Sequence, residues 1–250
     1  PAGFGKTSLL AQWRPEHLAH GKIVAWLSAQ AEDNPQRFVR SLALAVRIGS
    51  GRPTFGHTLL AGAAPGGLEG ITSWLAEVAQ SALDIVLMVD SADQLPPASR
   101  ETLTYLLHNA PANLRVEVAA RGDHDLAVAD LVNYGQCVVI GTTLLRFRLE
   151  ETMGLARARF GTRIDADTAA QLHELTEGWP LGLQLALAAT GQRADLRTAF
   201  KAASARAGDL HDYFADMLGK NLAADDAAFL ARIAIFDNLH PELCRALTDA

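Results

Sequence analysis

The sequence has 250 residues, of which 49% are hydrophobic and 20% charged, and a formal net charge of −6. This composition excludes a mainly disordered chain, because enough apolar surface is present to offset the entropy of ordering. No apolar run approaches the ~20 residues that a membrane-spanning helix needs. The acidic balance argues against this segment gripping nucleic acid itself, since that contact requires a basic surface. Cys137 and Cys244 have no metal-site or disulfide spacing and predict packed thiols.

The first part of the chain alternates short β-branched runs with amphipathic stretches. The runs predict strands at residues 23–28, 85–89, 116–120 and 137–140, and the stretches predict helices near residues 6–19, 35–48, 68–81 and 98–109. Short apolar runs followed by turn residues are typical of strands buried on both faces of a parallel sheet. We therefore expect an α/β domain over residues 1–147.

Two regions differ from this pattern. Residues 49–70 are rich in Gly, Pro and Ala and predict a long loop. Beyond residue 148 the strand signals stop, and helices are expected at 149–160, 167–176, 181–190, 195–206, 210–222, 225–236 and 241–248. Asp165 is one of several acids placed to cap such a helix. Residues 148–250 are therefore predicted to form an all-helical second domain.

The first eight residues carry most of a phosphate-loop pattern, G-x-x-x-x-G-K-[ST]. They are Pro1, Ala2, Gly3, Phe4, Gly5, Lys6, Thr7 and Ser8. Small residues let the backbone N–H groups converge on phosphate oxygens, Lys6 can reach the β- and γ-phosphates, and the Thr7 hydroxyl can bind Mg²⁺. The helix that follows directs the positive end of its dipole at the same phosphates. The alternative is a glycine-rich turn that enters a helix, with Lys6 and Thr7 there by chance.

The phosphate-loop pattern begins one position before Pro1, so the strand that normally precedes the loop is expected outside residues 1–250. The resemblance to P-loop NTPases implies that this strand lies inside the sheet, between the strand that ends at Arg121 and the one near Ile140. Each buried backbone group left unsatisfied costs about 1–3 kcal/mol. We therefore expect residues 1–250 alone to be poorly soluble or loosely folded.

An acidic residue ends the second predicted strand. Asp90 follows an apolar run, and a carboxylate at this edge of a parallel sheet can hold Mg²⁺ opposite Thr7. The alternative is an Asp that caps a helix or a turn. Many nucleotide hydrolases place a second acid directly afterwards, but this chain has Ser91, and the nearest carboxylates, Asp84 and Asp93, do not have the right offset. We therefore expect at most slow hydrolysis.

Arg121 directly follows the third predicted strand. A guanidinium at that sheet edge can sense a γ-phosphate through charge-assisted hydrogen bonds, whereas the alternative is an ordinary solvated loop arginine. The eight histidines are scattered and predict no metal cluster.

Several motifs together resemble the MalT-like large ATP-binding regulators of the LuxR class, within the STAND group of P-loop NTPases. The matching segments are residues 1–7, 12–13, 24–28, 120–121, 145–147, 150–151, 176–186, 212–214 and 243–247, together with the acidic strand. The most specific is Thr176-Glu177-Gly178-Trp179-Pro180, which carries the family's G-x-P signature and precedes an apolar helix. The resemblance covers nearly the whole chain.

The resemblance implies an ATP/ADP switch in a cytoplasmic transcriptional activator. Nucleotide and Mg²⁺ would lie between the α/β and helical domains, with Pro180 beside the base. Lys6, Asp90 and Arg121 would carry any catalysis. ATP together with a small-molecule inducer would favour a self-associating form. Further domains outside this segment would bind the inducer and, through a helix-turn-helix, DNA.

Two other functions remain open at this point. One is an ordinary hydrolytic ATPase of the motor or remodelling type, and the other is a scaffold that binds no nucleotide. The absence of an acid at Ser91 favours the switch over the hydrolytic enzyme.

Overall fold

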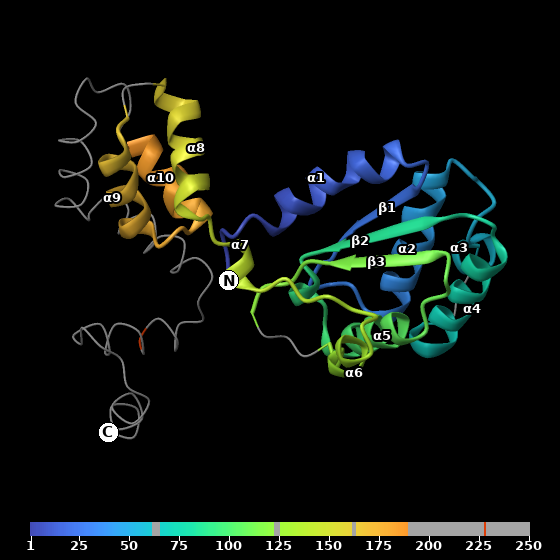
Figure 1. Ribbon diagram of the computed structural model, residues 1–250. Helices are drawn as coiled ribbons and strands as arrows, with labels where there is room; N and C mark the ends of the chain where they lie inside the picture. Colours follow the sequence, from blue (N-terminus) through green and yellow to red (C-terminus); the bar gives the residue numbers. More distant parts are fainter. Residues whose placement is uncertain (62–65, 123–125, 162–163, 190–227, 229–250) are drawn as a thin grey trace. The chain divides into compact units, whose positions relative to one another are not determined.

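The computed structural model describes residues 1–61, 66–122, 126–161, 164–189 and 228 (Figure 1). The chain divides into two compact units, Pro1–Arg146 and Phe147–Ala250. Within the described residues, no helix combines the length and the apolar character needed to cross a membrane.

The first unit is built on a parallel sheet of three strands, in the order β1-β2-β3 (Figure 1). The strands are β1 (Ile23–Ser28), β2 (Ile85–Asp90) and β3 (Leu114–Val118). Ser28 is paired with Asp90, and Val89 with Val118. The three carboxyl ends therefore meet at one edge of the sheet, which is where ligands bind in open α/β folds.

Three helices pack against one face of the sheet: α2 (Pro35–Ser50), α4 (Gly67–Gln80) and α5 (Pro97–His108). The helix α2 begins at Pro35 because the Asn34 side chain caps it, accepting a hydrogen bond from the Arg37 N–H at 2.9 Å. Fully buried side chains such as Trp74 and Leu87 fill the space between helices and strands.

The helix α1 (Lys6–Ala19) packs against the other face. Successive strand residues point to opposite faces, so Val86 and Met88 face α1 while Leu87 faces α2, α4 and α5. Leu10 of α1 completes the smaller cluster on this side. The covering of both faces explains why every residue of β2 is buried.

The prediction of a loop over residues 49–70 is wrong for part of that segment. A short helix, α3 (His57–Leu60), lies within it, and the side chains of Phe55 and Leu59 are buried in the core. The segment is also anchored by polar contacts, because Arg47 Nε donates to the Phe55 carbonyl at 2.8 Å and the Gly56 N–H donates to Glu77 at 2.7 Å.

The predicted strand at 137–140 is also wrong. These residues form no strand, and the side chains of Val138 and Val139 are 83% and 62% exposed. A strand requires a hydrogen-bonded neighbour, and in the described part of the chain β3 pairs with β2 alone. Two short helices flank the segment, α6 (Ala129–Asn133) and α7 (Thr142–Leu145). The strand predicted at 116–120 is present but begins two residues earlier, at Leu114.

The described part of the second unit is helical. It contains α8 (Leu149–Phe160), α9 (Ala166–Thr176) and α10 (Pro180–Ala189), which pack around an apolar cluster of their own. Asp165 caps α9 as predicted, accepting a hydrogen bond from the Thr168 N–H at 2.8 Å. The helices predicted at 195–206, 210–222, 225–236 and 241–248 and the thiol of Cys244 lie outside the described residues, apart from residue 228, which is helical.

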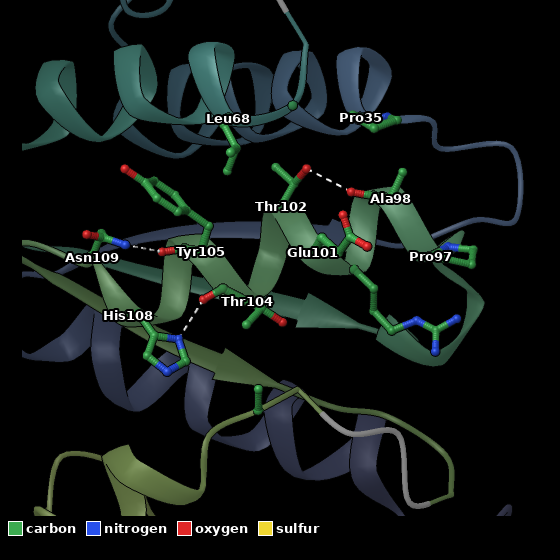
Figure 2. A pocket seen from close by; sticks show the side chains of 13 residues that line it. Pro35, Leu68, Pro97, Ala98, Glu101, Thr102, Thr104, Tyr105, His108 and Asn109 are labelled. Carbon is green, nitrogen blue, oxygen red and sulfur yellow. Dashed lines mark hydrogen bonds between the residues drawn. The ribbon is translucent and has the colours of Figure 1, made fainter.

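A pH-dependent contact joins α5 to α6. His108 Nε2 lies 3.1 Å from Asp130. The other ring nitrogen lies 2.9 Å from the Thr104 carbonyl, and Figure 2 draws this second contact as a dashed line. These hydrogen bonds raise the pKa of His108 above its ordinary 6.5, and the bond from His108 lowers the pKa of Asp130 below its ordinary 3.8.

The stabilisation from the His108 pKa shift should therefore be full below about pH 6.5 and be lost as the pH rises through the raised pKa. The contribution of Asp130 should be full above about pH 3.8 and be lost at lower pH. We predict that His108→Gln lowers the melting temperature more at pH 5.5 than at pH 8.5. The control is His20→Gln, whose ring lies 2.7 Å from a backbone carbonyl, that of Glu16. An equal loss at both pH values in the His108 variant would contradict the prediction.

Candidate functional site

The residues before α1 form a tight turn that ends at the first turn of the helix. Gly3 and Gly5 have φ angles of 74° and 73°, in the left-handed region that side chains other than glycine rarely adopt. Gly5 is the N-cap of α1, and no side chain caps this end of the helix. The first turn of α1 also contains no acidic residue. Its N–H groups and the helix dipole therefore favour an anion here.

Lys6 lies at the start of α1 and spans the turn. Its Nζ donates a hydrogen bond to the Pro1 carbonyl at 2.6 Å. Burial and the nearby positive charge of Arg121 lower the pKa of Lys6, and the charges of Asp93 and Asp90 act in the opposite direction. Two cations therefore lie close enough to repel each other beside the turn, which is the electrostatic condition that an anion relieves.

Thr7 and Asp90 are brought together by the first turn of α1 and the end of β2. The Thr7 hydroxyl lies 3.0 Å from each oxygen of the Asp90 carboxylate. Asp90 is 8% exposed, and one of its oxygens also accepts a hydrogen bond from the Ser91 N–H at 2.9 Å. A hydroxyl beside a carboxylate is a hard-oxygen donor set of the kind that Mg²⁺ prefers, so these two residues fit the predicted ion.

The remaining residues of the predicted loop have different environments. Phe4 is 8% exposed and so anchors the turn in the protein, whereas Ser8 is exposed on α1. Ala2 is half-buried. The predicted loop is thus fixed at Phe4, while the residues on both sides of it are accessible to solvent.

The chain turns sharply after β2. Ser91 has a left-handed backbone, with φ 57° and ψ 38°, and a single 3₁₀ turn, η1 (Ala92–Gln94), follows. The position where many hydrolases carry a second acid is therefore a serine at the start of a turn. The turn brings Asp93 back toward the end of β3, where one of its oxygens accepts a hydrogen bond from the Arg121 N–H at 2.8 Å.

The sequence identifies Asp93 as one of the carboxylates nearest to Asp90, but it does not predict what Asp93 does. On an extended strand, an Asp three residues after the strand end has the wrong offset for a hydrolytic acid, so the sequence predicts no catalytic role for it. The structure shows that the strand is not extended there. Asp93 contacts the backbone of Arg121 and contributes to the charge around Lys6. It therefore belongs to a charged cluster together with Lys6, Asp90 and Arg121.

The G-x-P segment lies in the second unit, so the predicted position of Pro180 beside a nucleotide base stays a prediction. Helix α9 ends at Thr176, Gly178 has φ 69°, and α10 begins at Pro180, which confirms the predicted helix break. The Gly178 carbonyl accepts a hydrogen bond from the N–H of Phe147, the first residue of this unit, at 2.8 Å. The turn therefore holds the start of the unit against the start of α10.

A groove of about 770 Å³ runs along α5 (Figure 2). It is lined by side chains of α5 such as Glu101, Tyr105 and His108, with Leu68 of α4 at its border. None of residues 1–5, which form the turn before α1, lines this groove. The groove is therefore separate from the charged cluster that contains Lys6 and Asp90, and it contains none of those predicted site residues.

The chain is homologous to a class of transcriptional regulators of the helix-turn-helix type. The relatives are the MalT regulators: those of Vibrio campbellii and Vibrio cholerae are each 30% identical to it over 254 residues, and that of Serratia proteamaculans is 28% identical over 266 residues. Each similarity covers 99% of this chain. The resemblance expected from the motifs is thereby confirmed. No protein-family model matches the chain.

The chain spans 28% of the length of these curated relatives. The homology therefore concerns one region of a MalT regulator. What the whole regulators bind and control is not a property of this region by itself.

Gly178 should be irreplaceable for a geometric reason. Its φ is in the left-handed region, and a Cβ built on it would collide with the Phe147 carbonyl oxygen. We predict that Gly178→Ala destabilises the second unit by about 2–4 kcal/mol, in chemical denaturation followed by circular dichroism.

The matched control is Gly154→Ala, in the same unit. Gly154 is exposed within α8, and a Cβ there would meet no atom within 4 Å. This substitution should stabilise the unit by about 0.5–1 kcal/mol, because alanine loses less backbone entropy than glycine in a helix. Shifts of the same sign in both variants would contradict the geometric argument.

Proposed function

We propose that this region is the ATP- and ADP-binding switch of a cytoplasmic MalT-type transcriptional activator. Nucleotide with Mg²⁺ binds at the turn before α1, and the bound state controls how the helical unit is arranged. The ATP-bound form favours self-association. The inducer and DNA bind to other parts of the regulator, DNA through a helix-turn-helix.

The observation that carries this proposal is the contact of the Thr7 hydroxyl with both Asp90 oxygens, at 3.0 Å. It joins the first turn of α1 to the carboxyl edge of the sheet. The Thr7 and Asp90 oxygens would hold Mg²⁺, directly or through its water shell. The ion would supply positive charge that offsets the negative charge of the phosphates.

Two features of the chain itself would hold the phosphates. The N–H groups at the turn and in the first turn of α1 donate to phosphate oxygens, as the left-handed backbone at Gly3 and Gly5 allows. Lys6 exchanges its bond to the Pro1 carbonyl for a bond to phosphate. The new bond joins two charged groups, whereas the Pro1 carbonyl is a neutral acceptor.

Arg121 provides a means of distinguishing the two nucleotides. Its positive charge already acts on Lys6. The repulsion between the two cations is therefore reduced most by the ligand that places the most negative charge between them. ATP carries one more phosphate group than ADP. The Arg121 side chain is exposed at the sheet edge and would bind that γ-phosphate.

Slow hydrolysis follows from the residue at position 91. A general base must lie within hydrogen-bond reach of the water that it activates. Asp90 is already bonded to Thr7 and to the Ser91 N–H, and the next residue is a serine. The chain therefore favours retention of ATP over its turnover, which suits a switch.

We predict that Lys6→Ala weakens ATP binding about 10- to 100-fold in calorimetry, because a charged hydrogen bond contributes roughly 1.5–3 kcal/mol. The control is Lys22→Ala. Lys22 lies at the other end of the sheet, where it pairs with Asp84 at 3.3 Å, and its removal should leave ATP affinity unchanged. Undiminished affinity in the Lys6 variant would overturn the phosphate-loop assignment, whereas absence of ATP binding by the unaltered protein would favour the scaffold.

Turnover separates the switch from the hydrolytic ATPase. We predict steady-state ATP hydrolysis well below ~1 per second, the low end for typical enzymes, at saturating ATP and Mg²⁺. Sustained turnover above that rate, abolished in Lys6→Ala, would favour a motor or remodelling enzyme instead.

A further inference from the structure

The ends of β2 and β3 stay connected beyond the sheet. The Ala119 N–H donates to the Val89 carbonyl at 2.9 Å, and the Ala92 N–H donates to the Ala119 carbonyl at 2.9 Å. Two residues after Ala119, the N–H of Arg121 continues this series of hydrogen bonds. It donates to a side chain, the Asp93 carboxylate, at 2.8 Å.

The Asp93 side chain thus replaces a backbone carbonyl as the acceptor at the point where the backbone hydrogen bonds between the two strand ends stop. Since β2 has turned into η1, no carbonyl of an extended strand lies opposite Arg121. The carboxylate supplies the acceptor instead. This bond fixes the main chain at Arg121, although the arginine is exposed and lies beyond the sheet.

The bonding of Asp93 argues against a direct role in chemistry. One carboxylate oxygen accepts from the Arg121 N–H at 2.8 Å and the other from the Gln94 side-chain amide at 3.1 Å. Thr7, the predicted metal residue, contacts Asp90. The carboxylate of Asp93 is therefore used to hold protein groups in place.

We propose that Asp93 is the positioning residue of the nucleotide sensor: its carboxylate fixes the backbone of Arg121 so that this guanidinium distinguishes ATP from ADP. The inference rests on the proposed function, since it requires that the cluster binds nucleotide. Asp93 also lies near Lys6, where its charge opposes the repulsion between the two cations. The effect of the hydrogen bond to the Arg121 backbone and the effect of the negative charge of Asp93 can be tested separately.

The test compares Asp93→Asn with Asp93→Ala. Asparagine keeps an oxygen that can accept from the Arg121 N–H but removes the charge, whereas alanine removes both. Affinities for ATP and ADP are measured by calorimetry with Mg²⁺, and the readout is their ratio. A general loss of folding would weaken both nucleotides together and leave that ratio unchanged.

We expect Asp93→Ala to lower the preference for ATP about tenfold, the effect of one charged hydrogen bond, and Asp93→Asn to retain most of it. Arg121→Ala should abolish the same preference. In the double variant, Asp93→Ala should cause no further loss, because both changes act through one guanidinium. The matched control is Asp84→Ala, an exposed acid before the opposite end of β2, which should leave the ratio unchanged.

The outcomes distinguish this inference from the proposed function. Absence of ATP binding by the unaltered protein would overturn both. Intact binding with an unchanged ratio in Asp93→Ala would overturn the positioning role alone. Equal losses in the Asn and Ala variants would also overturn it, since charge and not the backbone bond would then be responsible.

Discussion

The burial of β2 between two parallel neighbours is the constraint on which the candidate site depends. All six of its residues are buried, and its register with β1 and β3 brings the three carboxyl ends to one edge. Asp90 can end such a strand only because polar partners meet it there, namely the Thr7 hydroxyl and the Ser91 N–H. The same edge receives Arg121 from the end of β3. The charged cluster is thus a product of strand register as much as of the individual residues.

The sequence predicted the residues whose role follows from a strand end. Asp90 and Arg121 were found because a parallel sheet places such residues together. The role of Asp93 could not be predicted, because residue spacing after Asp90 applies to an extended chain, whereas the left-handed backbone at Ser91 reverses the chain. That reversal is not encoded in residue type, since serine has no preference for this conformation comparable to that of glycine or asparagine.

The two errors in the fold have a common physical origin, because local composition does not report tertiary partners. Val138 and Val139 have strand propensity, yet the described residues offer them no strand to pair with. Phe55 and Leu59 lie in a stretch rich in glycine and proline, yet each finds a place in the core. Burial of these two apolar side chains, together with the polar contacts of Phe55 and Gly56, holds this part of the segment against the core.

The backbone at Ser91 also limits what a substitution there would change. Aspartate is among the few residues that enter the left-handed region readily, so an acid at this position would need no change in the path of the chain. One substitution could therefore add a second carboxylate directly after Asp90 while the ends of the strands keep their positions.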